Sequence, residues 1–87
     1  MARYRIEISA TAERQLKKIR REDQIRILRS ISLLAGDQRP RGCKKMSGYE
    51  DIYRIRVGNY RVIYEIDGNR VLVIILKIGH RSEVYRS

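Results

Sequence analysis

Two tight turns divide the second half of this chain into strands. Apolar residues alternate with arginines over residues 53–57, Gly58-Asn59 follows as a two-residue hairpin signal, and residues 60–66 return as a second strand. Another hairpin turn lies at residues 67–69. After it, residues 71–78 are almost wholly apolar, as in a strand that is covered on both faces. The sequence therefore predicts three consecutive antiparallel strands.

The first half of the chain predicts one strand followed by two helices. Residues 4–8 alternate between apolar and charged side chains, which is the pattern of a half-buried strand. Ser9 is a suitable N-cap for a helix whose apolar residues recur at positions 12, 16 and 19. A second apolar stripe over residues 27–35 ends at Gly36, and residues 44–46 are compatible with one further short strand.

These elements define the expected fold class, which is α+β. Their order is β-α-α-β-β-β, and we expect a helical hairpin packed on a small antiparallel sheet. At 87 residues the chain has room for a single domain, spanning residues 1–87. The residues expected in or near the core are Ile27, Leu28, Ile31, Leu34, Val62, Val73 and Ile75.

The net charge restricts the partners that this chain can have. Lys and Arg total 20 against 10 Asp and Glu, which gives a formal net charge of +10, and the excess occurs in both halves of the chain. Such a domain attracts phosphate backbones, anionic membranes or an acidic protein partner. A membrane is the least favoured of the three, because no amphipathic anchor or lipidation signal is visible. The longest apolar run, residues 71–76, is also far shorter than a membrane span.

The N-terminus and the cysteine content favour a cytoplasmic protein. The first seven residues carry charge where an export signal needs an apolar stretch. Cys43 is the only cysteine, which excludes an internal disulfide and fits a reducing compartment. The carboxylates show no metal-ligand spacing with His80, the only histidine, so we expect neither a metal site nor a cofactor.

Arginines on the predicted strands form the first candidate site. If the apolar residues of 53–57 face the core, Arg54 and Arg56 project from the opposite face, about 7 Å apart. Arg61 follows the first turn, and His80 and Arg81 follow the last strand. Convergence of these side chains on one phosphodiester and a solvated basic face are equally compatible with the pattern.

Tyr85 is the second candidate. It is an aromatic residue in a short polar segment close to Arg81. Nearby positive charge favours the phenolate, which would let the hydroxyl act as a general base. From the residues alone, packing of Tyr85 against the sheet edge is the favoured alternative. For His80, proton donation, phosphate contact and a loop position without a catalytic role all stay open.

Two segments of the chain resemble the RelE toxin family, part of the RelE/ParE superfamily. The run from Gly48 to Tyr64 is similar to a hairpin that family members share, in which a Tyr-Arg-Ile-Arg segment precedes a Gly-x-Tyr-Arg segment. The run from Gly79 to Tyr85 is similar to the family's ending, in which Gly-His-Arg is followed by Val-Tyr. The family also has the element order predicted above, so the resemblance covers the whole chain.

The resemblance implies a toxin of a type II toxin–antitoxin system. Its activity would be that of a ribosome-dependent, metal-independent endoribonuclease, which cleaves messenger RNA in the A site and inhibits translation. A ribose 2′-hydroxyl would attack the adjacent phosphate. The implied partners are a cognate antitoxin that covers the basic face, the ribosome and mRNA, with no small-molecule substrate.

The resemblance also assigns roles to individual residues. Tyr85 would be the general base, Arg61 would stabilise the transition state, and Arg81 would orient the phosphate or assist the leaving oxygen. Well-known members have lysines where this chain has Arg54 and Arg56, which would contact the RNA backbone. The implied catalytic residues are thus Arg61, Arg81 and Tyr85, and the implied RNA-binding residues are Arg54, Arg56 and His80.

Two other functions are compatible with the sequence. A ParE-like toxin that inhibits gyrase would have the same fold, although that branch generally lacks the arginine–tyrosine pair that Arg81 and Tyr85 provide. A non-enzymatic nucleic-acid-binding module would need only the charge. The chain shows neither an RNA-recognition consensus nor a helix-turn-helix spacing.

Overall fold

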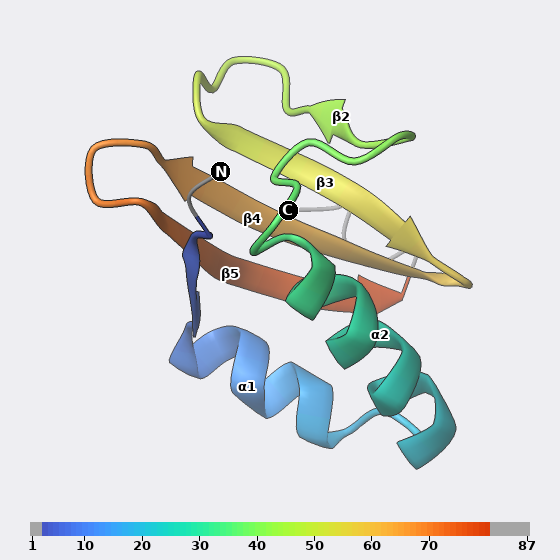
Figure 1. Ribbon diagram of the computed structural model, residues 1–87. Coiled ribbons are helices and arrows are strands. Elements are labelled where there is room, and N and C mark those ends of the chain that lie inside the picture. Colours follow the sequence, from blue (N-terminus) through green and yellow to red (C-terminus); the bar gives the residue numbers. More distant parts are fainter. Residues whose placement is uncertain (1–2, 81–87) are drawn as a thin grey trace.

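Two helices lie over one face of a five-stranded mixed sheet (Figure 1). This computed structural model describes residues 3–80. It confirms the α+β class and the predicted order of the elements, with the short additional strand at residues 44–45. The strands are ordered β1-β5-β4-β3-β2 in the sheet. The elements are β1 (Arg5–Ile8), α1 (Ala10–Lys17), α2 (Arg21–Leu33), β2 (Lys44–Lys45), β3 (Ile52–Val57), β4 (Tyr60–Asp67) and β5 (Leu72–His80).

The hairpin of β3 and β4 turns at Gly58-Asn59, as the sequence predicts. Val57 pairs with Tyr60, so only these two residues lie between the strands. Gly58 has a φ of 61°, in the left-handed region that favours glycine. An added Cβ would make only an ordinary van der Waals contact with the Arg26 guanidinium, at 3.4 Å. The turn therefore suits glycine because of its backbone conformation.

β1 differs from the expected arrangement, because it pairs in parallel with β5. The sheet is therefore mixed and not wholly antiparallel. The backbone N–H of Ser9 donates to the carbonyl of Ile75 at 2.9 Å, and its hydroxyl donates to the carbonyl of Leu76 at 3.1 Å. These bonds hold the end of β1 beside β5 where α1 begins. The apolar pattern of β5 predicts a covered strand, but it carries no information on the direction of a distant neighbour.

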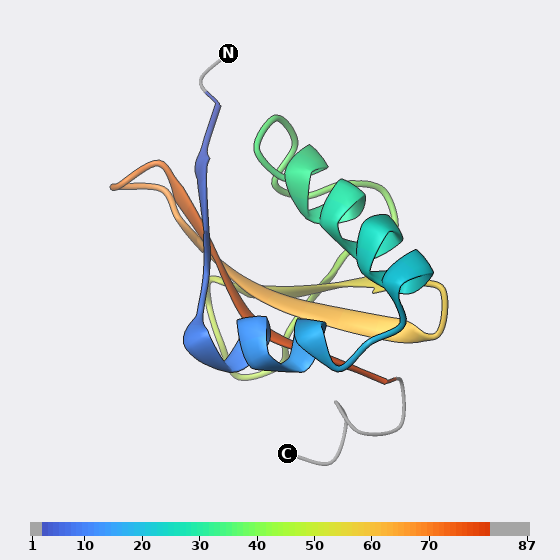
Figure 2. The ribbon, with the colours of Figure 1, turned by 90° about the horizontal axis from the view of Figure 1, so that it is seen from below.

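The helices cover one face of the sheet and enclose the core against it (Figure 2). α1 packs against β5 and α2 against β3, and α2 runs back in roughly the opposite direction to α1. The Ser9 hydroxyl caps α1 by accepting from the backbone N–H of Ala12 at 3.1 Å. Neither helix of residues 3–80 has the length and apolar character needed to cross a membrane.

The prediction that Leu28 lies in the core is wrong. Leu28 is 39% exposed, whereas Ile27 and Ile31 are buried. One residue along a helix turns the side chain by about 100°, so Leu28 lies at the margin of the face that Ile27 and Ile31 present to the sheet. The other expected core residues are buried: Leu34, Val62, Val73 and Ile75.

Tyr64 anchors the segment that joins α2 to β2. It is fully buried, and its hydroxyl donates to the carbonyl of Gln38 at 2.8 Å. Tyr53 stacks on it with 6.1 Å between ring centroids, and Arg39 Nε donates to the Tyr53 hydroxyl at 3.1 Å. Burial raises the pKa of Tyr64 well above its usual value, so the hydroxyl stays protonated as a donor. These contacts fix the connecting segment to the sheet just before β2.

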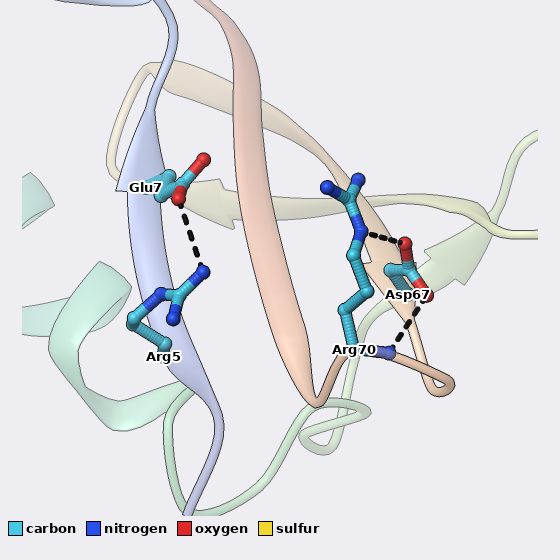
Figure 3. Close-up of polar contacts among 4 residues, drawn as sticks. All are labelled: Arg5, Glu7, Asp67 and Arg70. Carbon is cyan, nitrogen blue, oxygen red and sulfur yellow. Dashed lines mark hydrogen bonds and ion pairs between the residues drawn. The ribbon is translucent and has the colours of Figure 1, made fainter.

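Exposed ion pairs lie on β1 and at the turn between β4 and β5 (Figure 3). Arg5 and Glu7 of β1 are 3.4 Å apart between Nη2 and Oε2. At the turn, the Asp67 carboxylate accepts from Arg70 Nε at 2.7 Å and from the Arg70 backbone N–H at 3.1 Å. The hydrogen bond from the Arg70 side chain, followed by that from its backbone, holds the pKa of Asp67 below its usual value.

Candidate nucleic-acid interface

Three arginines project from the sheet face opposite the helices. Ile55 and Val57 are buried, so the alternation along β3 places Arg54 and Arg56 on the other face. Arg56 pairs with Arg61 of β4, and directly paired residues project from the same face. The structure thus brings Arg54, Arg56 and Arg61 together on one face.

Lys44 of β2 joins these arginines. It pairs with Arg54 and, together with Arg54, Arg56 and Arg61, lines a hollow of about 270 Å³. These four residues, Lys44, Arg54, Arg56 and Arg61, are named the basic cluster below. Lys44 was not among the predicted site residues. Its place depends on the register between a two-residue strand and β3, which no local pattern in the sequence reports.

The spacing of the basic cluster suits an anion. The Cα atoms of neighbouring members along one strand are about 7 Å apart, and those of members paired across strands are about 5 Å apart. Like charges on side chains that begin this close together repel one another, and an anion between them relieves the repulsion. A concave surface with charge of one sign also concentrates the electrostatic field and attracts an oppositely charged ligand.

Arg61 is the most constrained member of the basic cluster. It is 8% exposed, and among residues 3–80 it is the only charged residue that is buried. Burial of a guanidinium costs desolvation free energy, but it holds the group in place and leaves it charged. Arg56 is exposed by contrast, and its Nε donates to the carbonyl of Gly58 at 3.2 Å. The hollow thus combines a fixed buried cation with cations that solvent reaches.

His80 lies apart from the basic cluster. It pairs with Tyr60, whose side chain packs against the core, and the two rings meet edge to face at 5.9 Å between centroids. Gly79 is the residue that pairs with Arg61. The structure therefore does not bring His80 into the hollow. The other two predicted site residues, Arg81 and Tyr85, lie outside the described residues.

The basic cluster supplies positive charge and hydrogen-bond donors. Guanidinium groups match the geometry of phosphate oxygens and bind them through paired N–H groups. They do not exchange protons near neutral pH, so they stabilise negative charge and do not act as a general base. The described residues thus define the class of this protein: a small α+β domain that carries a basic, anion-attracting cluster on the sheet face opposite its helices.

Residues 6–85 match the family model described as the ParE toxin of type II toxin–antitoxin systems, parDE. Because the match extends over nearly the whole chain, this chain belongs to the ParE toxin family, within the RelE/ParE superfamily that the sequence predicts.

Curated relatives of the chain are RelE toxins. Toxin RelE3 of Methanocaldococcus jannaschii is 45% identical over 42 residues, which are 48% of this chain and 46% of the relative. Toxin RelG of Mycobacterium tuberculosis is 41% identical over 34 residues, which are 39% of each chain. The matched segment thus spans less than half the length of these relatives.

Solved structures extend the likeness over the whole fold. A chain of the archaeal RelE–RelB complex from Pyrococcus horikoshii superposes with a TM-score of 0.81 at 29% identity, covering 92% of this chain and 97% of that chain. A chain of the toxin–antitoxin complex RelBE2 from Mycobacterium tuberculosis gives a TM-score of 0.79 at 26% identity, covering 91% and 99%. The fold is therefore RelE-like.

Proposed function

We propose that this toxin is an endoribonuclease that cleaves messenger RNA in the ribosomal A site, without a metal ion, and so inhibits translation in the cytoplasm. The observation that carries the proposal is the basic cluster, in which buried Arg61 lies beside Arg54 and Arg56 on one sheet face. A fixed cation beside exposed cations is what stabilisation of a phosphate transition state requires. The RelE names of the matched relatives support the same activity.

In the proposed reaction, the ribose 2′-oxygen attacks the adjacent phosphorus and the bond to the leaving 5′-oxygen breaks. Tyr85 accepts the proton of the 2′-hydroxyl as general base. Arg61 stabilises the additional negative charge that develops on the phosphate oxygens. Arg81 orients the phosphate or assists departure of the 5′-oxygen, which takes its proton from water because His80 lies apart from the basic cluster.

The remaining arginines of the basic cluster hold the substrate. Arg54 and Arg56 contact the RNA backbone around the phosphate that Arg61 engages. The basic cluster contributes charge and not proton transfer, so the rate depends on an RNA strand that arrives with its 2′-oxygen in line with the phosphorus. We assign that task to the ribosome, which presents the A-site codon.

A cognate antitoxin is the second proposed partner. The related chains from Pyrococcus horikoshii and Mycobacterium tuberculosis were solved in toxin–antitoxin complexes. The net charge of +10 favours a partner with an acidic element. An antitoxin laid across the basic cluster would compete with RNA for the same cations and so silence the toxin.

Toe-printing of a translated mRNA, with and without the protein, tests the nuclease activity. We expect new reverse-transcription stops within the A-site codon, and a product that ends in a 2′,3′-cyclic phosphate. A matched mRNA with a single 2′-deoxy substitution at the cleaved nucleotide should stay intact, because it lacks the attacking oxygen. Cleavage of the deoxy substrate, or no cleavage of either substrate, contradicts the proposal.

Gyrase is the second candidate target, because the description of the matching family names ParE. A supercoiling assay with the same protein preparation separates the two activities. Loss of gyrase-dependent supercoiling together with intact mRNA would assign the chain to gyrase inhibition. Ribosome binding without either effect would leave only a nucleic-acid-binding module.

A further inference from the structure

An apolar groove of about 330 Å³ lies on the open face of the sheet. Thr11, at the start of α1, borders it. The rest of its lining consists of six residues that are named the apolar groove below: Met46, Tyr49, Ile52, Ile63, Leu76 and Lys77. The volume is near the lower end of the range for small-molecule sites. The proposed cleavage reaction makes no use of it.

The apolar groove begins where the basic cluster ends. Lys44 pairs with Arg54, Arg54 with Ile63, and Ile63 with Lys77, so one row of side chains crosses four strands on the same face. The first two residues of this row belong to the basic cluster and the last two to the apolar groove. Ile52 lies one step further along β3, about 7 Å from Arg54.

Tyr49 offers an aromatic face at the apolar groove. It is 57% exposed, although it lines the groove together with aliphatic side chains. Its backbone N–H donates to the carbonyl of Met46 at 3.3 Å, and the N–H of Met46 donates to the carbonyl of Ile52 at 2.8 Å. These two bonds close residues 46–52 into a tight loop that holds Tyr49 beside the sheet.

We propose that the apolar groove holds one nucleobase of the bound RNA strand, stacked on Tyr49. The inference rests on the proposed function, since it needs a phosphate of the same strand on the basic cluster. Arg54 of the basic cluster and Ile52 of the apolar groove are about 7 Å apart along β3. A nucleotide spans a similar distance between its phosphate and its base. Aromatic side chains beside a cationic track are the usual means of binding single-stranded nucleic acid, and stacking of this kind accepts any base.

The continuity with the basic cluster favours a base over an apolar side chain of a protein partner. The row that Lys77 shares with Arg54 leads directly from the apolar groove to the basic cluster. A short hollow with cations at its border suits a flat group attached to an anionic backbone. An apolar side chain gains nothing from those cations.

The chain has no tryptophan, so Tyr49→Trp introduces a single reporter into the apolar groove. The probes are a short single-stranded RNA and an oligonucleotide of the same length whose backbone carries no bases. We expect the base-bearing RNA to quench the emission of the new tryptophan strongly, because its ring would stack on a base. The abasic strand should bind through its phosphates and leave the emission nearly unchanged. Fluorescence anisotropy of labelled strands measures binding independently.

Ile25→Trp is the matched control, because Ile25 is 49% exposed on α2, which covers the other face of the sheet. Its emission should not respond to either strand. In the wild-type context, Tyr49→Ala should weaken binding of the base-bearing RNA about ten-fold, the scale of one lost stacking contact. Tyr49→Phe should retain most of the affinity, and none of these changes should alter binding of the abasic strand.

Equal quenching by both strands, or bound RNA that leaves the Tyr49→Trp variant unquenched, overturns the base-binding groove. A response of the same variant to the antitoxin alone would assign the groove to the protein partner. The nuclease proposal fails separately, through intact mRNA in the toe-printing experiment. Base-specific quenching together with intact mRNA would support base binding in the groove and contradict the nuclease activity.

Discussion

Burial separates Arg61 from Arg54 and Arg56, and the difference should appear in kinetics. Arg61→Ala removes a fixed cation that acts on charge developing in the transition state, so single-turnover cleavage on programmed ribosomes should fall by about 10²–10³. Ribosome affinity should fall less, because the partly exposed Arg54 and the exposed Arg56 remain. Arg29→Ala removes the same charge from an exposed position of α2 and should leave both quantities unchanged. Equal losses of affinity and rate with Arg61→Ala would assign Arg61 to binding only.

Tyr85 is tested by the removal of one oxygen. Tyr85→Phe keeps the ring and deletes the proposed proton acceptor, so cleavage should drop by about two or more orders of magnitude. Ribosome pelleting and urea unfolding should stay close to wild type, since packing changes little. A near-normal rate would exclude Tyr85 as general base and make His80→Gln the next variant to measure.

Asp67 contributes stability that depends on pH. Its pKa is held below the ordinary value of 3.8 by hydrogen bonds from Arg70, so the ionised form is favoured in the folded state. The contribution is therefore present above the unfolded pKa and is lost as the pH falls through the folded pKa. Asp67→Asn should lower the urea midpoint at pH 7, and the difference between the two proteins should shrink as the pH falls below the ordinary pKa of an aspartate. Glu50→Gln, at an exposed loop position, is the control for removing one surface carboxylate without breaking the contact to Arg70.

The candidate site shows which of its residues can be predicted from the sequence and which cannot. Arg54 and Arg56 were predictable because alternation along one strand fixes the face, and Arg61 followed from a two-residue turn. Lys44 and Tyr49 were missed because their places depend on the pairing of β2 and on a loop closed by hydrogen bonds. His80 is set apart from the basic cluster by strand register, which a count along the sequence does not give.

At the scale of elements, α2 provides a direct test of its buried face. Ile31→Ala empties a site that is 2% exposed, and the free energy of unfolding should fall by about 2–5 kcal/mol. Leu28→Ala, at a residue that is 39% exposed, should cost about 1 kcal/mol or less. Urea denaturation of the two variants measures the difference. A larger loss for Leu28→Ala would mean that another face of α2 is buried.

The elements themselves were predictable where their signals are local. The β3–β4 turn was predicted from Gly58-Asn59, and α1 from the Ser9 cap and its apolar stripe, because these interactions act within a few residues. The parallel pairing of β1 with β5 was not predicted. It joins segments from opposite ends of the chain, and the bonds from Ser9 to β5 that fix it have no counterpart in either segment alone.

Across the whole molecule, the fold divides the two sheet faces between two tasks. The helices and the aliphatic side chains occupy one face, which supplies most of the stability (Figure 2). The other face carries the basic cluster and the apolar groove. Substitutions on this second face should therefore alter RNA binding with little effect on folding, with the exception of the buried residues Arg61 and Ile63.

Salt dependence tests whether this face, or the total charge, binds RNA. Each phosphate contact to a single strand releases condensed counterions and contributes about 0.7 to the slope of log K against log salt. Arg54→Ala removes one proposed contact, so the slope for single-stranded RNA should decrease by about 0.7. Arg29→Ala lowers the net charge equally. Arg29, however, lies at an exposed position of α2, away from the basic cluster. Its slope should match the wild type, because a distant charge releases no counterion from the bound strand. Equal slopes for the two variants would mean that RNA binds the charged surface without regard to face, and the basic cluster would lose its role.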